Sequence, residues 1–194
     1  MKRNSELTLL VLMALFMALC YVSFMFLKIP IPGTSASVHF GNAFCLIAVL
    51  VFAYLFGGTP KACIKGGVFG GICGALGMGL ADLTSSPAWL PYTLTLKFAF
   101  AMITGLLLAA LVRTKLNEWV RTTVACAAGM LFNLIAAPVA NYLTLVYMLH
   151  SDAEASGILA GWSSIPSAVN AVVSTFAAPA IYLALRPALR RMKK

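Results

Sequence analysis

The chain has 194 residues, of which 61% are apolar and 10% are charged, whereas about a quarter of the residues of an ordinary soluble domain are charged. A soluble domain of this size cannot bury so much apolar surface, which excludes a soluble enzyme, a disordered chain and a small disulfide-stapled fold. The net charge of +9 does not indicate nucleic-acid binding, because the basic residues stand at the ends of apolar runs and form no patch. The composition predicts an all-α, polytopic membrane protein with one domain over residues 1–194 and no nucleic acid among its partners.

Six apolar segments follow one another along the chain. They occupy residues 7–27, 40–56, 66–81, 91–112, 122–149 and 163–185. At a rise of about 1.5 Å per residue, most of them can cross the roughly 30 Å hydrocarbon core of a bilayer. No small-residue cleavage site stands before Lys28, so we interpret the first segment as a retained helix rather than a signal peptide.

The third segment is short for a membrane span and rich in glycine. We therefore expect neighbouring helices, rather than lipid, to surround it. Its glycines recur at four-residue spacing, in the sets Gly66, Gly70, Gly74 and Gly67, Gly71. Small residues at this spacing let membrane helices approach closely, and no Lys-Ser or Lys-Thr pair follows that would make the segment a phosphate-binding loop.

The distribution of basic residues predicts which side each loop faces. Twelve of the fourteen Lys and Arg residues fall on one side of the six spans: Lys2, Arg3, Lys61, Lys65, Arg113, Lys115, Arg121, Arg186, Arg190, Arg191, Lys193 and Lys194. The other side carries only Lys28, and Lys97 falls inside a span. Because cytoplasmic loops carry the excess of Lys and Arg, we expect both termini in the cytoplasm, and residues 28–39, 82–90 and 150–162 outside.

No motif of a known catalytic or metal site appears in the sequence. The chain has no HExxH, Walker A or GxSxG motif, and neither of its two histidines falls in the middle of a span. The five cysteines show no paired spacing, so we interpret them as small buried apolar residues; they are Cys20, Cys45, Cys63, Cys73 and Cys126. We therefore expect no catalytic residue, no metal and no cofactor.

Lys97 is the residue that most constrains the function. It lies about six positions into the fourth segment, hence roughly 9 Å below its outer end. An ammonium group at such depth costs about 2.5–3.5 kcal/mol or more unless it is paired or hydrated. Asp82 is the nearest acid. Lys97 therefore either serves the structure, as a partner of Asp82 or as a lysine that snorkels to the membrane surface, or lines an outward-facing polar cavity and meets a ligand. Pairing and ligand binding are not exclusive.

Polar residues recur at helical spacing on the last three segments. The fourth segment has Thr93, Lys97 and Ala101; the fifth has Asn133, Ala137 and Asn141, with Tyr142 beside them; the sixth has Ser163, Ser167, Asn170 and Ser174. Polar residues on one face of a membrane helix point inward, either to bond neighbouring helices or to line a cavity. With Trp89 and Tyr92 nearby, the pattern predicts a cavity that binds a small polar molecule by hydrogen bonds and stacks a flat ring.

Four short motifs stand out along the chain: Val38-His39-Phe40-Gly41-Asn42 and Leu55-Phe56-Gly57-Gly58 around the second segment, Gly79-Leu80-Ala81-Asp82-Leu83, and Pro91-Tyr92-Thr93-Leu94-Thr95-Leu96-Lys97. Together they resemble the substrate-binding S component of energy-coupling factor (ECF) vitamin transporters, in particular the riboflavin-type subgroup. Ala14-Leu15-Phe16-Met17-Ala18 is similar to the family's AxxxA contact with the coupling subunit. The resemblance covers nearly the whole chain.

This resemblance implies six helices, N-in and C-in, in the plasma membrane of a bacterial cell. It implies a vitamin or vitamin precursor bound near the outer face, such as riboflavin, pyridoxine, a hydroxymethylpyrimidine or pantothenate, and a body that topples in the membrane. The partners would be a transmembrane coupling subunit, docked on Ala14 and Ala18, and two ATPase subunits. Candidate ligand-binding residues are Lys97, Asn141, Asn170, Trp89, Tyr92, Tyr142, Asn133, Asp82, Asn42 and His39.

Two other classes of protein stay open as alternatives. A membrane-embedded enzyme would need a catalytic cluster at membrane depth, and the sequence shows none. A stand-alone secondary transporter of small polar metabolites is usually built from internal repeats or paired broken helices. The halves 1–97 and 98–194 show no convincing similarity, and no span has a carboxylate in its interior.

Overall fold

A computed structural model describes residues 2–30, 32 and 37–192 of the chain. The long helices are α1 (Lys2–Met25), α3 (Pro60–Ser85), α4 (Leu90–Leu111), α5 (Glu118–Leu143) and α7 (Ser164–Met192), and α2 (Gly41–Leu55) and α6 (Ala153–Trp162) are shorter. Two three-residue strands, β1 (Lys28–Pro30) and β2 (Ser37–His39), pair antiparallel. A 3₁₀ turn, η1 (Pro87–Trp89), precedes α4, and a π-helical turn, η2 (Thr144–Met148), continues α5.

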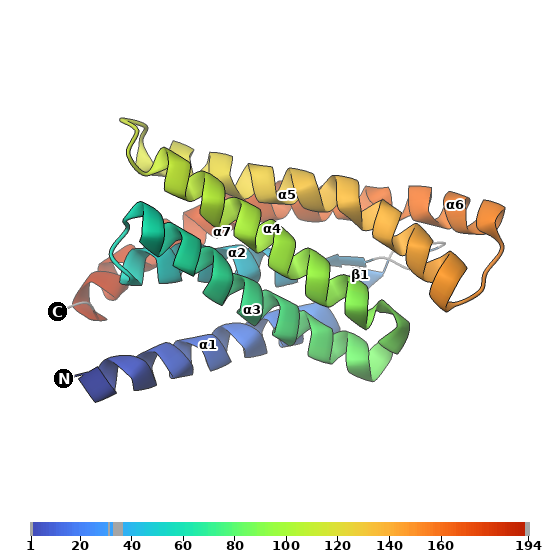
Figure 1. Cartoon of the computed structure of the whole chain (residues 1–194), viewed down its shortest axis with the longest axis horizontal. Coiled ribbons are helices and arrows are strands. Elements are labelled where there is room, and N and C mark those ends of the chain that lie inside the picture. The colour runs from blue at the N-terminus through green and yellow to red at the C-terminus, as the bar shows by residue number, and fades with distance from the viewer. Residues whose placement is uncertain (1, 31, 33–36, 193–194) are drawn as a thin grey trace.

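The helices form one bundle with both termini at the same end (Figure 1). The turns between α2 and α3 and between α4 and α5 lie at this end too, whereas α6 and η1 lie at the opposite end. Five helical stretches are long and apolar enough to cross a membrane, and α2 adds a shorter apolar helix. This arrangement agrees with an even number of crossings and with basic loops on the side of the termini, although Lys193 and Lys194 lie outside the described residues.

The expectation that the third helix is the short one is wrong. Helix α3 has 26 residues and α2 has 15, so α2 reaches only about 22 Å along its axis. All but three residues of α2 are buried, and the helix therefore does not need to match the thickness of the bilayer. Capping explains why α3 begins at Pro60. Thr59 accepts a hydrogen bond from the Ala62 amide, 3.2 Å away, and proline is favoured at the first position of a helix.

The glycines of α3 bring three other helices into close contact with it, as their spacing predicts. A methyl group at Gly66 or Gly70 would approach the backbone of Val49 in α2 to 2.6 Å, and one at Gly67 would come within 3.2 Å of the Ala101 carbonyl oxygen in α4. Gly77 faces the Met17 carbonyl oxygen of α1 in the same way. Without side chains between them, these backbones pack at a distance that larger residues would prevent.

The segments expected as outer loops contain more structure than the sequence indicated. Residues 28–39 include the β1–β2 pair, and residues 150–162 include α6, which begins at an N-cap where Asp152 accepts from the Ala155 amide. The five cysteines are buried and free, as expected. The polar stripes of α4, α5 and α7 meet at the end of the bundle that carries α6 and the two strands.

Candidate functional site

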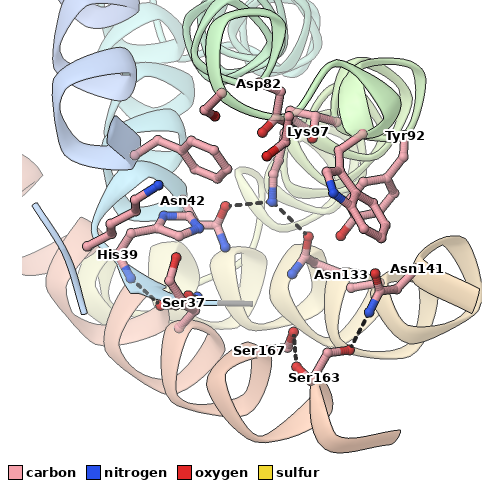
Figure 2. Close-up of a pocket in the computed structure, with 18 residues that line it drawn as sticks. Ser37, His39, Asn42, Asp82, Tyr92, Lys97, Asn133, Asn141, Ser163 and Ser167 are labelled. Carbon is pink, nitrogen blue, oxygen red and sulfur yellow. Dashed lines mark hydrogen bonds between the residues drawn. The ribbon is translucent and has the colours of Figure 1, made fainter. Parts of the chain in front are cut away.

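A polar cavity of about 150 Å³ opens between the helices at the end opposite the termini. Helices α4 and α5 each contribute three of its side chains, and the others come from α1, α2, α3, α7, β1, β2, η1 and the turns beside them (Figure 2). Eighteen residues line it: Phe24, Lys28, Ser37, His39, Asn42, Asp82, Ser85, Ser86, Trp89, Tyr92, Thr93, Lys97, Asn133, Ala137, Asn141, Ser163, Ser167 and Asn170.

Two asparagines hold the Lys97 ammonium group in this cavity. The Lys97 Nζ atom donates to Asn42 Oδ1 at 3.0 Å and to Asn133 Oδ1 at 3.5 Å (Figure 2). Only 5% of Lys97 is exposed, so the two amide oxygens replace much of the hydration that the cation loses on burial. Because an ammonium can only donate, both asparagines must turn their oxygens towards it, which leaves their NH₂ groups for other acceptors.

Asp82 does not form an ion pair with Lys97. Its carboxylate accepts instead from the Thr93 hydroxyl, one helical turn before Lys97. Among the described residues, the one ion pair is Arg186 with Glu118, at the other end of the bundle. The structural pair that the sequence left open is therefore not what holds Lys97, although Asp82 lies close enough to contribute negative charge to the cavity.

The two outer asparagines of the site, Asn141 and Asn170, differ in whether their side chains keep a free hydrogen-bonding atom. Asn141 donates its Nδ2 to Ser163 Oγ at 3.0 Å, and its Oδ1 has no partner among the described residues. Asn170 accepts from the His39 amide and donates to the Ser37 carbonyl, both at 2.9 Å. Asn170 thus joins α7 to β2, and both its Oδ1 and its Nδ2 are used in hydrogen bonds within the fold.

His39 is held in its neutral form. Its Nδ1 accepts from the Gly41 amide at 3.1 Å, so Nε2 carries the proton. Burial, helped by the positive charges of Lys97 and Lys28, lowers the pKa of His39 from 6.5 to about 3. A methyl group at position 41 would lie 3.1 Å from the same Nδ1. The absence of a side chain at Gly41 therefore leaves space for the imidazole ring.

The structure brings nine of the ten residues singled out from the sequence to the wall of the cavity. Tyr142 is the exception: it follows Asn141 on α5, is half-buried and does not line the cavity. Five residues that line the cavity were not among those predicted from the sequence: Phe24, Lys28, Ser37, Ser85 and Ser86. Of these, only Lys28 stood out in the sequence, because it is the single Lys or Arg residue of the predicted outer loops.

The expected docking residues lie on α1 and do not line the cavity. Ala14 and Ala18 are both exposed, and Leu15 and Val11 beside them are 50% and 58% exposed. Phe16, in contrast, points inward and is 5% exposed. The alternative that the two alanines pack inside the same chain therefore does not hold, and they face outward from the bundle.

A second cavity, of about 340 Å³, lies at the end that carries the termini. Four of its polar side chains are engaged with one another. Glu118 pairs with Arg186 and accepts from the Tyr182 hydroxyl at 3.0 Å, and the Arg186 guanidinium lies over the Tyr54 ring, 5.8 Å from its centroid. These contacts tie α5 to α7 and α2, and the polar cavity around Lys97 is therefore the better candidate for a binding site.

The sequence profile of the family described as ECF-type riboflavin transporter, S component, matches residues 4–187 of this chain. The chain belongs to this family. The S component is therefore a multi-pass membrane protein of a transporter family, as its motifs indicated.

A curated relative carries no functional name. It is the "Uncharacterized protein in gap 3'region" of Pyrococcus woesei, 33% identical over 84 residues, which make up 43% of this S component and 48% of the relative. The S component thus spans about half the length of the relative that it matches. No solved structure matches it.

Proposed function

We propose that this S component captures a water-soluble vitamin or vitamin precursor in the cavity around Lys97, as the substrate-specific subunit of an ATP-driven uptake transporter. The observation that carries the proposal is a buried cation held by two neutral amides in an open polar cavity. A direct ion pair with the nearby Asp82 carboxylate would neutralise the charge of Lys97. Held by Asn42 and Asn133, Lys97 keeps a donor and its charge for a ligand.

The roles of the side chains follow from the atoms they have free. Lys97 and the NH₂ groups of Asn42 and Asn133 would donate to the ligand, and Asp82 and the Asn141 carbonyl would accept from it. Trp89 and Tyr92, with ring centroids 6.3 Å apart, would cover a flat ring near the outer end. Asn170 and His39 would position the β1–β2 pair that forms part of the wall.

Energy for uptake would come from other subunits. The sequence contains no Walker A motif, which fits a family whose members work with a transmembrane coupling subunit and two ATPases. We propose that the coupling subunit docks on the exposed Ala14 and Ala18 of α1. The cavity would then move from the outer to the inner side of the plasma membrane as the whole S component topples, with both termini in the cytoplasm.

Purification from a rich medium followed by mass spectrometry of the bound small molecule tests this proposal. We expect one vitamin or precursor at close to one molecule per chain. We also expect it to be absent from the Lys97→Met variant and present in Lys65→Met, which changes an exposed lysine at the opposite end of the bundle. Equal amounts of the molecule in both variants, or none in the wild type, would contradict the proposal.

A further inference from the structure

We propose that the ligand of this S component is a single six-membered heteroaromatic ring with several hydrogen-bonding substituents, and not a tricyclic flavin. The inference rests on the proposed function, because it names the class of molecule that the cavity around Lys97 takes. Four observations support it: the volume of the cavity, the polarity of its wall, its unpaired donor and acceptor atoms, and the arrangement of Trp89 and Tyr92.

The volume fits one ring. The cavity encloses about 150 Å³, and an engineered cavity of about 150 Å³ holds one benzene molecule. Sites for larger organic ligands enclose about 300–1,000 Å³. A flavin has three fused rings and a ribityl chain, and most of it would remain outside a space of this size.

The wall is more polar than a flavin requires. Fourteen of its eighteen residues are polar or charged, and Phe24, Trp89, Tyr92 and Ala137 are the others. Most small-molecule sites show the opposite balance, with an apolar wall and a few polar groups that set orientation. A wide aromatic system would press its apolar faces against amide and hydroxyl groups, whereas a small ring with substituents around its edge would satisfy them.

The free atoms define both donors and acceptors. Asn42 and Asn133 turn their oxygens towards Lys97. Their Nδ2 atoms have no partner among the described residues. One oxygen of Asp82 accepts from Thr93, and the second has no partner in the same part of the chain. The ligand should therefore present at least one N–H or O–H donor to Asp82 and Asn141. It should also present ring nitrogens or oxygens as acceptors for Lys97 and the two amides.

Trp89 and Tyr92 do not form a slot for a wide ring. Trp89 and Tyr92 meet edge to face, with 74° between their planes. Parallel rings could enclose a tricyclic system on both faces, but this pair offers one flat face and one edge. A single ring can lie against one of them while its substituents reach the polar wall.

Calorimetric titration of the purified full-length chain tests the inference with four probes: an amino-hydroxymethylpyrimidine, pyridoxine, riboflavin and pantothenate. We expect one of the two single-ring probes to bind at least tenfold more tightly than riboflavin and pantothenate. Tighter binding of riboflavin or pantothenate would overturn the inference and leave the proposed function intact. Failure of all four probes to bind would overturn the inference, and absence of any co-purified molecule as well would overturn the proposed function.

Filling the cavity locates the binding of the single-ring probe. Ala137 is buried in the wall, and Ala137→Phe should weaken that binding more than tenfold, whereas Ala180→Phe on the exposed face of α7 should not change it. Ser167→Leu fills the same space from α7 and replaces Ala137→Phe if that variant does not fold. Unchanged binding in a folded filling variant would place the ligand elsewhere and overturn the inference.

Discussion

Replacing Lys97 by methionine removes the charge from the cavity and keeps most of the volume of the side chain. The change leaves Asn42 Oδ1 and Asn133 Oδ1 without their donor. An unsatisfied buried acceptor costs about 1–3 kcal/mol, and the Asn133 bond, at 3.5 Å, contributes less than the Asn42 bond because it is long. Relief of the cost of burying an ammonium opposes this loss, so we expect the variant to remain folded.

The effect on binding should be larger than the effect on folding. A hydrogen bond from a charged donor contributes about 1.5–3 kcal/mol, and 1.4 kcal/mol corresponds to a tenfold change in affinity. We therefore expect Lys97→Met to weaken binding by a factor between about ten and somewhat more than one hundred. Titration of the purified variant with the molecule that co-purifies with the wild type measures this factor, and thermal unfolding in the same detergent checks the fold.

The matched control is Lys65→Met, which removes an exposed lysine of α3 at the other end of the bundle. It should bind as the wild type does. A Lys97→Met variant that unfolds like the wild type and binds with unchanged affinity would refute the reasoning, because Lys97 would then serve only the packing around Asn42 and Asn133.

Topology, docking and acid sensitivity give three further predictions. Reporter fusions at the C-terminus and within α6 should report opposite sides of the membrane, and the same side for both would contradict six crossings. The double change Ala14→Trp with Ala18→Trp should leave ligand binding by the isolated chain intact and abolish co-purification with the coupling subunit, because overpacking costs about 1–3 kcal/mol at each site; Val172→Trp, on an exposed face of α7, should assemble normally. His39, with its pKa lowered from 6.5 to about 3, stays neutral in the folded chain while the unfolded chain gains a proton below pH 6.5. The free energy of unfolding should therefore fall by about 2 kcal/mol between pH 7.5 and pH 5. If the Tm of His39→Asn falls with acid as much as the Tm of the wild type, His39 is not the cause.

The sequence could predict the bundle and much of the site because both depend on periodic patterns. Apolar runs separated by basic loops indicated the crossings, and glycines four residues apart indicated the contacts of α3. The stripes on the last three predicted segments, now α4, α5 and α7, placed Lys97, Asn133 and Asn141 on inward faces, and all three line the cavity. In each case the pattern lies within a single helix, so helical spacing alone determines which side chains share a face.

Contacts between distant segments were not predictable in this way. The bonds of Asn170 to Ser37 and His39 join positions more than 130 residues apart, and no periodicity reveals them. The short helix was misplaced for a related reason: apolar composition cannot distinguish a helix that faces lipid from α2, which other helices enclose. Helix α6 was read as a loop because ten residues are too few to show a clear helical period.

The choice between carboxylate and amide as the partner of Lys97 decides what the cavity can bind. A Lys97–Asp82 ion pair would cancel the two charges that a ligand could otherwise meet. In the observed arrangement Thr93 bonds Asp82, and Asn42 and Asn133 bond Lys97, so each charged group is held by neutral partners. The charges remain separate within one small cavity, which therefore presents a strong donor and a strong acceptor side by side. A ligand with complementary groups on adjacent positions of one ring can satisfy both at once, whereas a purely anionic or purely apolar molecule leaves one of them buried without a partner.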